Sequence, residues 1–190
     1  MDEASRRAMY TDLRGRFPEL FVNPPGADYE ILLDPDDVAA AQAAQAEELS
    51  RSGMPASVGE TGVVFADPYV LLLRDAVRRP DGALGTYIRV VPPGNASGVV
   101  VLPVHSGRVV LVRHFRHSIR DWQWEVPRGF GTPGETPADE ARRELADEIG
   151  VAATALHDLG TIHPDTGMTA SAVRLFLAEI TDEPRPADRE

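Results

Sequence analysis

The sequence contains no cysteine. It can therefore form no disulfide framework, and it offers no thiolate to a zinc ion. Long apolar runs are also absent: none approaches the ~20 residues that a membrane-spanning helix needs. The first ten residues, MDEASRRAMY, lack the apolar core of a signal peptide. We expect a cytoplasmic protein with no membrane partner.

Positive charge is scarce. Nineteen Lys and Arg residues stand against 30 Asp and Glu residues, which gives a formal net charge of −11 at pH 7. Such a balance argues against a nucleic-acid groove and against binding to an anionic membrane surface. An anionic small-molecule ligand would have to be met by a metal ion and a few local arginines.

The 190 residues, of which 43% are hydrophobic, suffice for one domain with a small appendage. Residues 1–34 have a mixed pattern that suggests extended or irregular structure. Residues 34–49, DPDDVAAAQAAQAEEL, predict a helix that begins at Asp34 or Asp36. Apolar runs and turn residues predict strands within 62–91 and 97–116, and two more at 156–161 and 173–180.

The most informative segment, between Gly129 and Val151, reads GFGTPGETPADEARRELADEIGV. Thr136 and Pro137 suit the start of a helix, and Gly150 suits its left-handed end. At about 100° per residue, four carboxylates share one arc of this helix, and apolar residues cover the adjoining, core-facing arc. The carboxylates are those of Glu140, Glu144, Asp147 and Glu148, and the apolar residues are Ala138, Ala141, Leu145 and Ile149.

This helix is poorly designed for stability alone. Glu140–Glu144 and Glu144–Glu148 are like-charge pairs at i,i+4, and Asp147 and Glu148 lie where the helix dipole disfavours anions. A bound cation reverses both effects, and Mg²⁺ prefers such oxygen ligands. The alternative interpretation is a solvated acidic face on an ordinary amphipathic helix, but the preceding glycine-rich loop argues against it.

At these residues the chain resembles the Nudix hydrolase family, whose box reads G-x5-E-x7-R-E-U-x-E-E-x-G-U. The matching residues are Gly129, Glu135, Arg143, Glu144, Leu145, Glu148, Gly150 and Val151. Asp147 replaces the first of the paired glutamates. The resemblance implies binding of Mg²⁺, or of Mn²⁺ in its place, and cleavage of nucleoside diphosphates that are linked to another group.

The resemblance also implies roles for single residues. Glu144 and Glu148 would be the principal metal ligands. Asp147, which has a shorter reach, and the backbone carbonyl of Arg128 would complete the metal shell. Glu135 and Arg143 would brace the loop against the helix, so that the expected catalytic set is Glu144, Arg143 and Glu135. A metal held in this way would lower the pKa of an attacking water.

The segment before the box, RHFRHSIRDWQWEVPRG, resembles that of the ADP-ribose pyrophosphatases, in which a strand ending in Q-Y-R leads to W-x-x-E-x-P-A-G. Arg116 falls on that subfamily's phosphate-contacting arginine. Arg116, Trp124 and Arg128 form the expected substrate-binding set. The loop HPDTGMTAS resembles P-x-P-G-x-x-x-E, but Ser171 stands where that subfamily has an acidic residue, often the general base.

Several residues have a second interpretation. Trp122 and Trp124 could stack on an adenine, or they could be core or dimer-interface aromatics. Arg116 could contact phosphate or pair with a surface carboxylate. Asp165 could supply the missing base, or it could serve only as a turn former in Pro-Asp-Thr-Gly.

Together these features predict an α+β protein of the Nudix type, an α/β/α sandwich around a mixed sheet. Residues 1–61 would form an N-terminal extension with a helix, and 62–91 antiparallel strands that form a homodimer. Residues 92–181 would be the hydrolase domain, and 182–190 a disordered tail. The expected reaction is hydrolysis of the pyrophosphate bond in ADP-ribose or a related nucleoside diphosphate sugar. The alternative is a nucleotide sensor with weakened catalysis.

Overall fold

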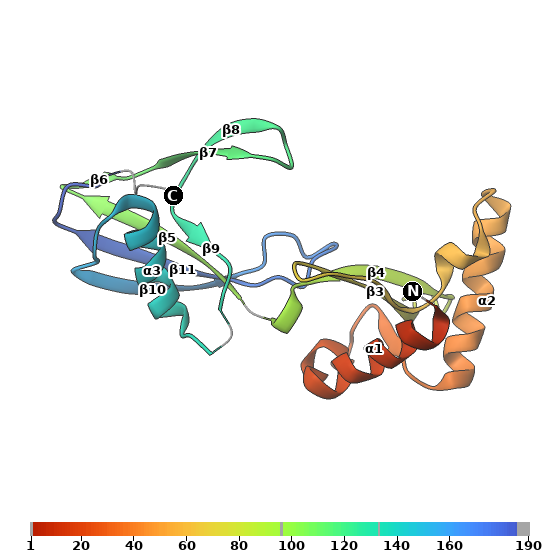
Figure 1. The fold of residues 1–190 in the computed structure, drawn as a ribbon. Helices are drawn as coiled ribbons and strands as arrows, with labels where there is room; N and C mark the ends of the chain where they lie inside the picture. The colour runs from red at the N-terminus through yellow and green to blue at the C-terminus, as the bar shows by residue number, and fades with distance from the viewer. Residues whose placement is uncertain (1, 96, 133, 186–190) are drawn as a thin grey trace. The chain divides into compact units, whose positions relative to one another are not determined.

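The structure, a computed structural model, describes residues 2–95, 97–132 and 134–185. The chain divides into two compact units (Figure 1). Unit 1 comprises Met1–Asn95 and Gly167–Ala170, and unit 2 comprises Ala96–Thr166 and Ser171–Glu190. Of the tail that was predicted to be disordered, residues 186–190 lie outside the described residues. Within its described part, Arg185 N donates a hydrogen bond of 3.0 Å to Ile149 O.

Unit 1 contains two α-helices, α1 (Glu3–Arg16) and α2 (Pro35–Arg51). Helix α2 begins as predicted, because the Asp34 side chain accepts hydrogen bonds from the amides of Asp36 and Asp37. Helix α1 was not predicted, since Leu13 is its one buried residue among those described and no apolar stripe announces it. Its signals are polar: an Asp2 cap on Ser5 N and i,i+4 ion pairs.

The sheet of unit 1 is antiparallel, as expected for residues 62–91. Its strands are β1 (Glu30–Leu32), β2 (Gly62–Ala66), β3 (Leu71–Arg78) and β4 (Leu84–Val91). Strand β3 pairs with all three others. Two short 3₁₀ turns, Pro18–Phe21 and Ala56–Gly59, connect these elements, and a third, Pro93–Asn95, follows β4. Apolar side chains from α1, β2, β3 and β4 form the core of the unit around Leu13, Val63, Leu73 and Val91.

The main sheet of unit 2 is mixed. Its strands are β5 (Gly98–His105), β6 (Arg108–Val109), β9 (Arg128–Gly129), β10 (Ala155–Ile162) and β11 (Val173–Ile180). Strands β5 and β11 run parallel, and the other pairs are antiparallel. Helix α3 (Pro137–Ile149) packs its apolar side on the face that carries Val99, Val101 and Phe176. The prediction of an α+β fold with a mixed sheet is confirmed.

A separate two-stranded hairpin projects from this sheet in Figure 1, formed by β7 (Val112–Arg116) and β8 (Asp121–Glu125). Side chains alternate along it, so that Phe115, Trp122 and Trp124 are exposed, whereas His114, Arg116, Gln123 and Glu125 are half-buried. The hairpin therefore has an aromatic outer face and a polar inner face.

Across the described residues, no helix combines the length and the apolarity that crossing a bilayer requires.

Candidate active site

Helix α3 positions the acidic residues, and its ends are formed as the sequence predicted. The Thr136 side chain caps the first turn by accepting from Asp139 N, and Pro137 occupies that turn. Gly150 ends the helix in the left-handed conformation, with φ 66°. The predicted core face, which includes Leu145 and Ile149, is buried. This packing fixes the rotation of the helix and therefore the direction of its carboxylates.

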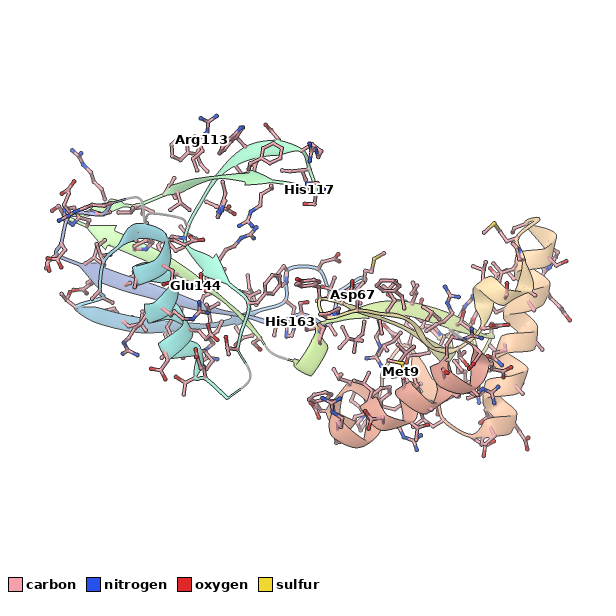
Figure 2. All side chains as sticks on the ribbon, viewed as in Figure 1. Met9, Asp67, Arg113, His117, Glu144 and His163 are labelled. Carbon is pink, nitrogen blue, oxygen red and sulfur yellow. The ribbon has the colours of Figure 1, made fainter. Side chains whose placement is uncertain are left out.

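Gly129 makes room for the carboxylate of Glu144. It lies in β9, paired with Val99 of β5. A methyl group at position 129 would overlap the Glu144 carboxylate, and even the farthest of its three atoms, Oε2, would be 2.9 Å away. The Glu144 side chain is 11% exposed and thus lies in a gap that only glycine provides. The loop and the helix of the box meet at this point, which Figure 2 marks by the Glu144 label on α3.

Arg143 joins four carboxylates of the box. Its Nη2 lies 3.0 Å from Glu144 Oε1 and also contacts Glu140. Its Nη1 donates to Asp147 Oδ2 at 3.2 Å, and its Nε lies 3.9 Å from Glu135 Oε2. The hydrogen bond to Glu140 raises the pKa of the Arg143 guanidinium above its ordinary value. The predicted brace between Arg143 and Glu135 is thus present only as a long contact.

Glu140 is the stronger link between loop and helix, which differs from its expected place on the acidic arc. It is 1% exposed, accepts from Thr132 N and pairs with Arg143. Burial alone would raise the pKa of Glu140, but the hydrogen bonds from Thr132 and Arg143 outweigh it and hold the pKa below its ordinary value. The helical projection could not reveal this role, because the loop turns back over the helix.

The environment of Glu144 favours proton uptake. Burial raises the pKa of this carboxyl, the charges of Asp147 and Glu140 raise it further, and Arg143 opposes them. A carboxylate whose pKa lies above its ordinary value accepts a proton more readily, as a general base must. The direction of this shift suits the catalytic role that the resemblance implies for Glu144.

The two acids near the end of α3 differ in exposure. Asp147 is 59% exposed at its side chain and turns toward Arg143. Glu148 is 11% exposed and faces the hairpin, where His114 Nδ1 lies 4.0 Å from its Oε1. Glu148 is therefore as little exposed as Glu144, whereas the Asp147 side chain faces solvent.

Sequence reasoning gave no role to Glu125, the last residue of β8. Its side chain is 14% exposed and contacts three basic groups on the inner side of the hairpin. Arg116 pairs with it through Nε (3.1 Å) and Nη2 (2.7 Å), Arg128 through Nε (3.1 Å), and His114 Nδ1 lies 3.2 Å away. The sequence does contain a signal for this role: Glu125 is the acidic residue of the W-x-x-E-x-P run, and it lies between Trp124 and Arg128, two of the expected substrate-binding residues.

A cavity of about 830 Å³ lies beside Glu148, within the range of small-molecule sites. Both faces of the hairpin line it: Phe115, Trp122 and Trp124 belong to the outer face, and His114 belongs to the inner face with Glu125. Trp124 is 66% exposed, so its ring is accessible. Figure 2 labels Arg113 and His117 on the same hairpin. Arg113 lies over the Trp122 ring, 4.9 Å from its centroid, so one of the two tryptophans already stacks with a cation.

The loop after β10 carries the other predicted residues. Asp165 is exposed, and Ser171 is half-buried. Residues 167–170 of the loop belong to unit 1, where Met168 and Ala170 exchange backbone hydrogen bonds with Val90 of β4. Ser171 itself belongs to unit 2 and brings no ionisable group to the site.

The donor set fits a hard cation. In the described ranges, no group of three or more His, Cys, Asp or Glu side chains is arranged to hold a metal ion. Glu144 and Glu148 lie one turn apart and are both little exposed, and Mg²⁺ is usually held by one or two carboxylates together with water and substrate oxygens. The gap at Gly129 supports this fit, because it places a carboxylate against the backbone of β9.

Known proteins that are similar to this chain include two ADP-ribose pyrophosphatases. An ADP-ribose pyrophosphatase from Mycobacterium tuberculosis is 34% identical over 119 residues, which cover 62% of this chain and 54% of that protein. An ADP-ribose pyrophosphatase from Bacillus subtilis is 30% identical over 131 residues, covering 67% and 69%. The chain thus spans about half the length of the first relative and about two thirds of the second.

A similar fold is found in a crystal structure of an ADP compounds hydrolase, with a TM-score of 0.58 and 21% identity over 67% of each chain. This likeness concerns the fold alone. A family model described as the NUDIX domain matches residues 92–190, just over half of the chain, and includes α3 with its glycine-rich loop. Members of this family generally use divalent metal ions. The chain therefore belongs to the Nudix family.

Proposed function

We propose that this chain hydrolyses the pyrophosphate bond of ADP-ribose or a related nucleoside diphosphate sugar, giving a nucleoside monophosphate and a sugar phosphate. The cation would be Mg²⁺, with Mn²⁺ able to replace it, and the enzyme would be cytoplasmic. The observation that carries the proposal is the Glu144 carboxylate in the gap at Gly129. The names of the Mycobacterium and Bacillus relatives support the substrate class.

Each predicted residue has a place in this proposal. Glu144 and Glu148 would hold the cation, with Asp147 at its outer side and the backbone carbonyl of Arg128 completing the shell. The cation would neutralise the pyrophosphate and acidify a water. Glu144 would take the proton of that water, while Arg143 and Glu135 hold the loop to the helix. Arg116 and Arg128 would bind phosphate, and Trp124 would stack on the base.

Mg²⁺ or Mn²⁺ is expected to raise the melting temperature as well as the activity, because a cation relieves the repulsion between the carboxylates of α3. Glu148→Gln should remove most of both effects and leave the fold intact. The matched control is Glu179→Gln, an exposed glutamate on β11 that pairs with His157. Thermal shifts and turnover of ADP-ribose, each with and without chelator, give the measurement. Full turnover in excess chelator would sink the mechanism.

A second candidate is a nucleotide sensor of the same fold with weakened catalysis. It is favoured by Ser171, which cannot act as a base at the position where the resemblance to ADP-ribose pyrophosphatases implies an acidic residue. A screen of nucleotide sugars and dinucleotides separates the two functions. The sensor would bind a nucleotide tightly without releasing a monophosphate, whereas the hydrolase would release one in proportion to added metal.

We further propose a homodimer through the strands of 62–91. This segment exposes large apolar side chains: Tyr69, in the turn between β2 and β3, is 85% exposed, and Phe65 on the outer strand β2 is 46% exposed. Sedimentation at micromolar concentration should give twice the 20.6 kDa mass of one chain. Phe65→Asp should yield monomers, and Val109→Asp, at a similarly exposed apolar residue of β6, should not. A wild-type mass of 20.6 kDa would refute the dimer.

A further inference from the structure

We propose that Glu125 is a positioning residue that makes Arg116 and Arg128 into a single clamp for a diphosphate group. The inference deepens the proposed function and rests on it for the identity of the ligand. It begins with a paradox, because a little-exposed carboxylate lies at the centre of the groups that should bind an anion. Its contacts with both arginines explain why it is there.

The geometry of the contacts leaves one side of each guanidinium unused. Arg116 engages Glu125 through Nε and Nη2, the side edge of its planar fork. Arg128 uses Nε alone. Among the described residues, the Nη1 group of Arg116 and both terminal nitrogens of Arg128 have no hydrogen-bond or ion-pair partner. Of these contacts with Glu125, Arg116 Nε to Glu125 Oε2 is a hydrogen bond, and the other two are ion-pair contacts. Each contact restricts the orientation of its guanidinium, and a restricted guanidinium directs its remaining N–H groups, as bidentate binding of phosphate requires.

Charge and exposure agree with this role. The Arg116 and Arg128 side chains are 31% and 48% exposed, while the Glu125 side chain between them is 14% exposed. Two guanidinium charges on one carboxylate leave these three side chains with a net charge of +1. The chain has no lysine, so that all 19 of its Lys and Arg positions are guanidinium groups, and its net charge is −11. In such an acidic chain, two adjacent arginines would be needed to attract an anionic diphosphate. To contact both phosphoryl groups at once, the two guanidinium groups must be held in a fixed geometry.

The direction in which Glu125→Gln changes the affinity for an anion tests the proposal. If Glu125 acted only through its charge, Glu125→Gln would strengthen the binding of an anion, because a repelling charge would be lost. If it positions the arginines, the same change should weaken binding about tenfold, because both side chains lose their common anchor. The probe is inorganic pyrophosphate, titrated calorimetrically into the full chain in excess chelator, so that no metal contributes.

The matched control is Asp121→Asn in the same strand. The Asp121 carboxylate accepts from Trp122 N and lies near the Gln123 amide, and it pairs with no arginine among the described residues. The Asp121→Asn variant should bind pyrophosphate as tightly as the wild type or slightly more tightly. In an Arg128→Ala background, Glu125→Gln should cost much less than in the wild type, because the two changes remove parts of one arrangement.

Kinetics give a separate readout. With ADP-ribose as substrate, Glu125→Gln should raise KM about tenfold and change kcat by less than about threefold, as expected when binding rather than chemistry is affected. Pyrophosphate binding weakened by Glu125→Gln without any hydrolysis would support the clamp and refute the hydrolase. Hydrolysis of ADP-ribose by Glu125→Gln with an unchanged KM would support the hydrolase and refute the clamp.

Pyrophosphate binding by folded Glu125→Gln that equals or exceeds the wild type would overturn the inference. Should this variant not fold, Glu125→Asp keeps the charge but shortens the reach by one methylene. It should also weaken binding, because one shorter carboxylate cannot hold both guanidinium groups, and unchanged binding would again overturn the proposal.

Discussion

Glu144→Gln is expected to lower kcat for ADP-ribose by about 10²–10⁴-fold, the range that a positioned general base contributes, with little change in KM. The carboxylate is little exposed, touches Arg143 and has a pKa raised by burial and by neighbouring acids. Glutamine keeps the shape and the contact to Arg143 but cannot accept a proton. Steady-state kinetics at saturating Mg²⁺ measure the effect.

The competing source of a base is Asp165, an exposed residue of the loop that precedes Ser171. Asp165→Asn is therefore the proper comparison, and it should lower kcat far less than Glu144→Gln. If the order of the two effects were reversed, the loop would supply the base and the assignment to α3 would be wrong. Ser171→Glu probes the same question from the other side. A rise in turnover by orders of magnitude would identify the natural protein as a weakened hydrolase, or as one specialised for a different substrate.

Much of this arrangement could be predicted from local sequence. The start and end of α3 depend on Thr136, Pro137 and Gly150, whose effects reach only a few residues. Strands β2 to β7, β10 and β11 follow from apolar runs bounded by turn residues and lie close to the predicted ranges, whereas β1, β8 and β9 were not predicted as strands. Helix α1 escaped prediction because its signals are a polar cap and charge pairs rather than an apolar stripe.

Contacts between distant segments could not be predicted in the same way. Glu140 shares the acidic side of α3 in projection, yet the loop folds over it and draws it into a buried contact with Thr132. Glu125 lies on a strand whose pattern shows alternation but not the partners of each face. Its three basic contacts depend on the register of β7 with β8, which places Val112 opposite Glu125, and on the turn that returns Arg128 to it.

Gly129→Ala is expected to reduce metal-stimulated activity about 100-fold while leaving the fold intact. The added methyl would occupy the position of the Glu144 carboxylate, which is the mobile end of a flexible side chain and can swing away. The cost in stability should therefore be small, whereas displacing a catalytic group by ~1 Å is enough for a 10²-fold loss. Gly15→Ala in α1 is the control for the substitution itself, because a methyl group at position 15 would meet no neighbouring atom within 4 Å.

A double-mutant cycle decides whether Glu144 carries the whole effect of Gly129→Ala. In a Glu144→Ala background there is no carboxylate to displace, so adding Gly129→Ala should change neither the residual activity nor the shift in melting temperature on adding Mg²⁺. Additive losses would mean that the glycine serves the backbone of β9 instead, for example through its pairing with Val99. In the wild-type background, Gly129→Ala should also abolish the thermal shift by Mg²⁺, because one of the two little-exposed carboxylates has left the site. A variant that kept full activity and the full metal shift would show that the gap at Gly129 is irrelevant to catalysis, and that the cation is held elsewhere.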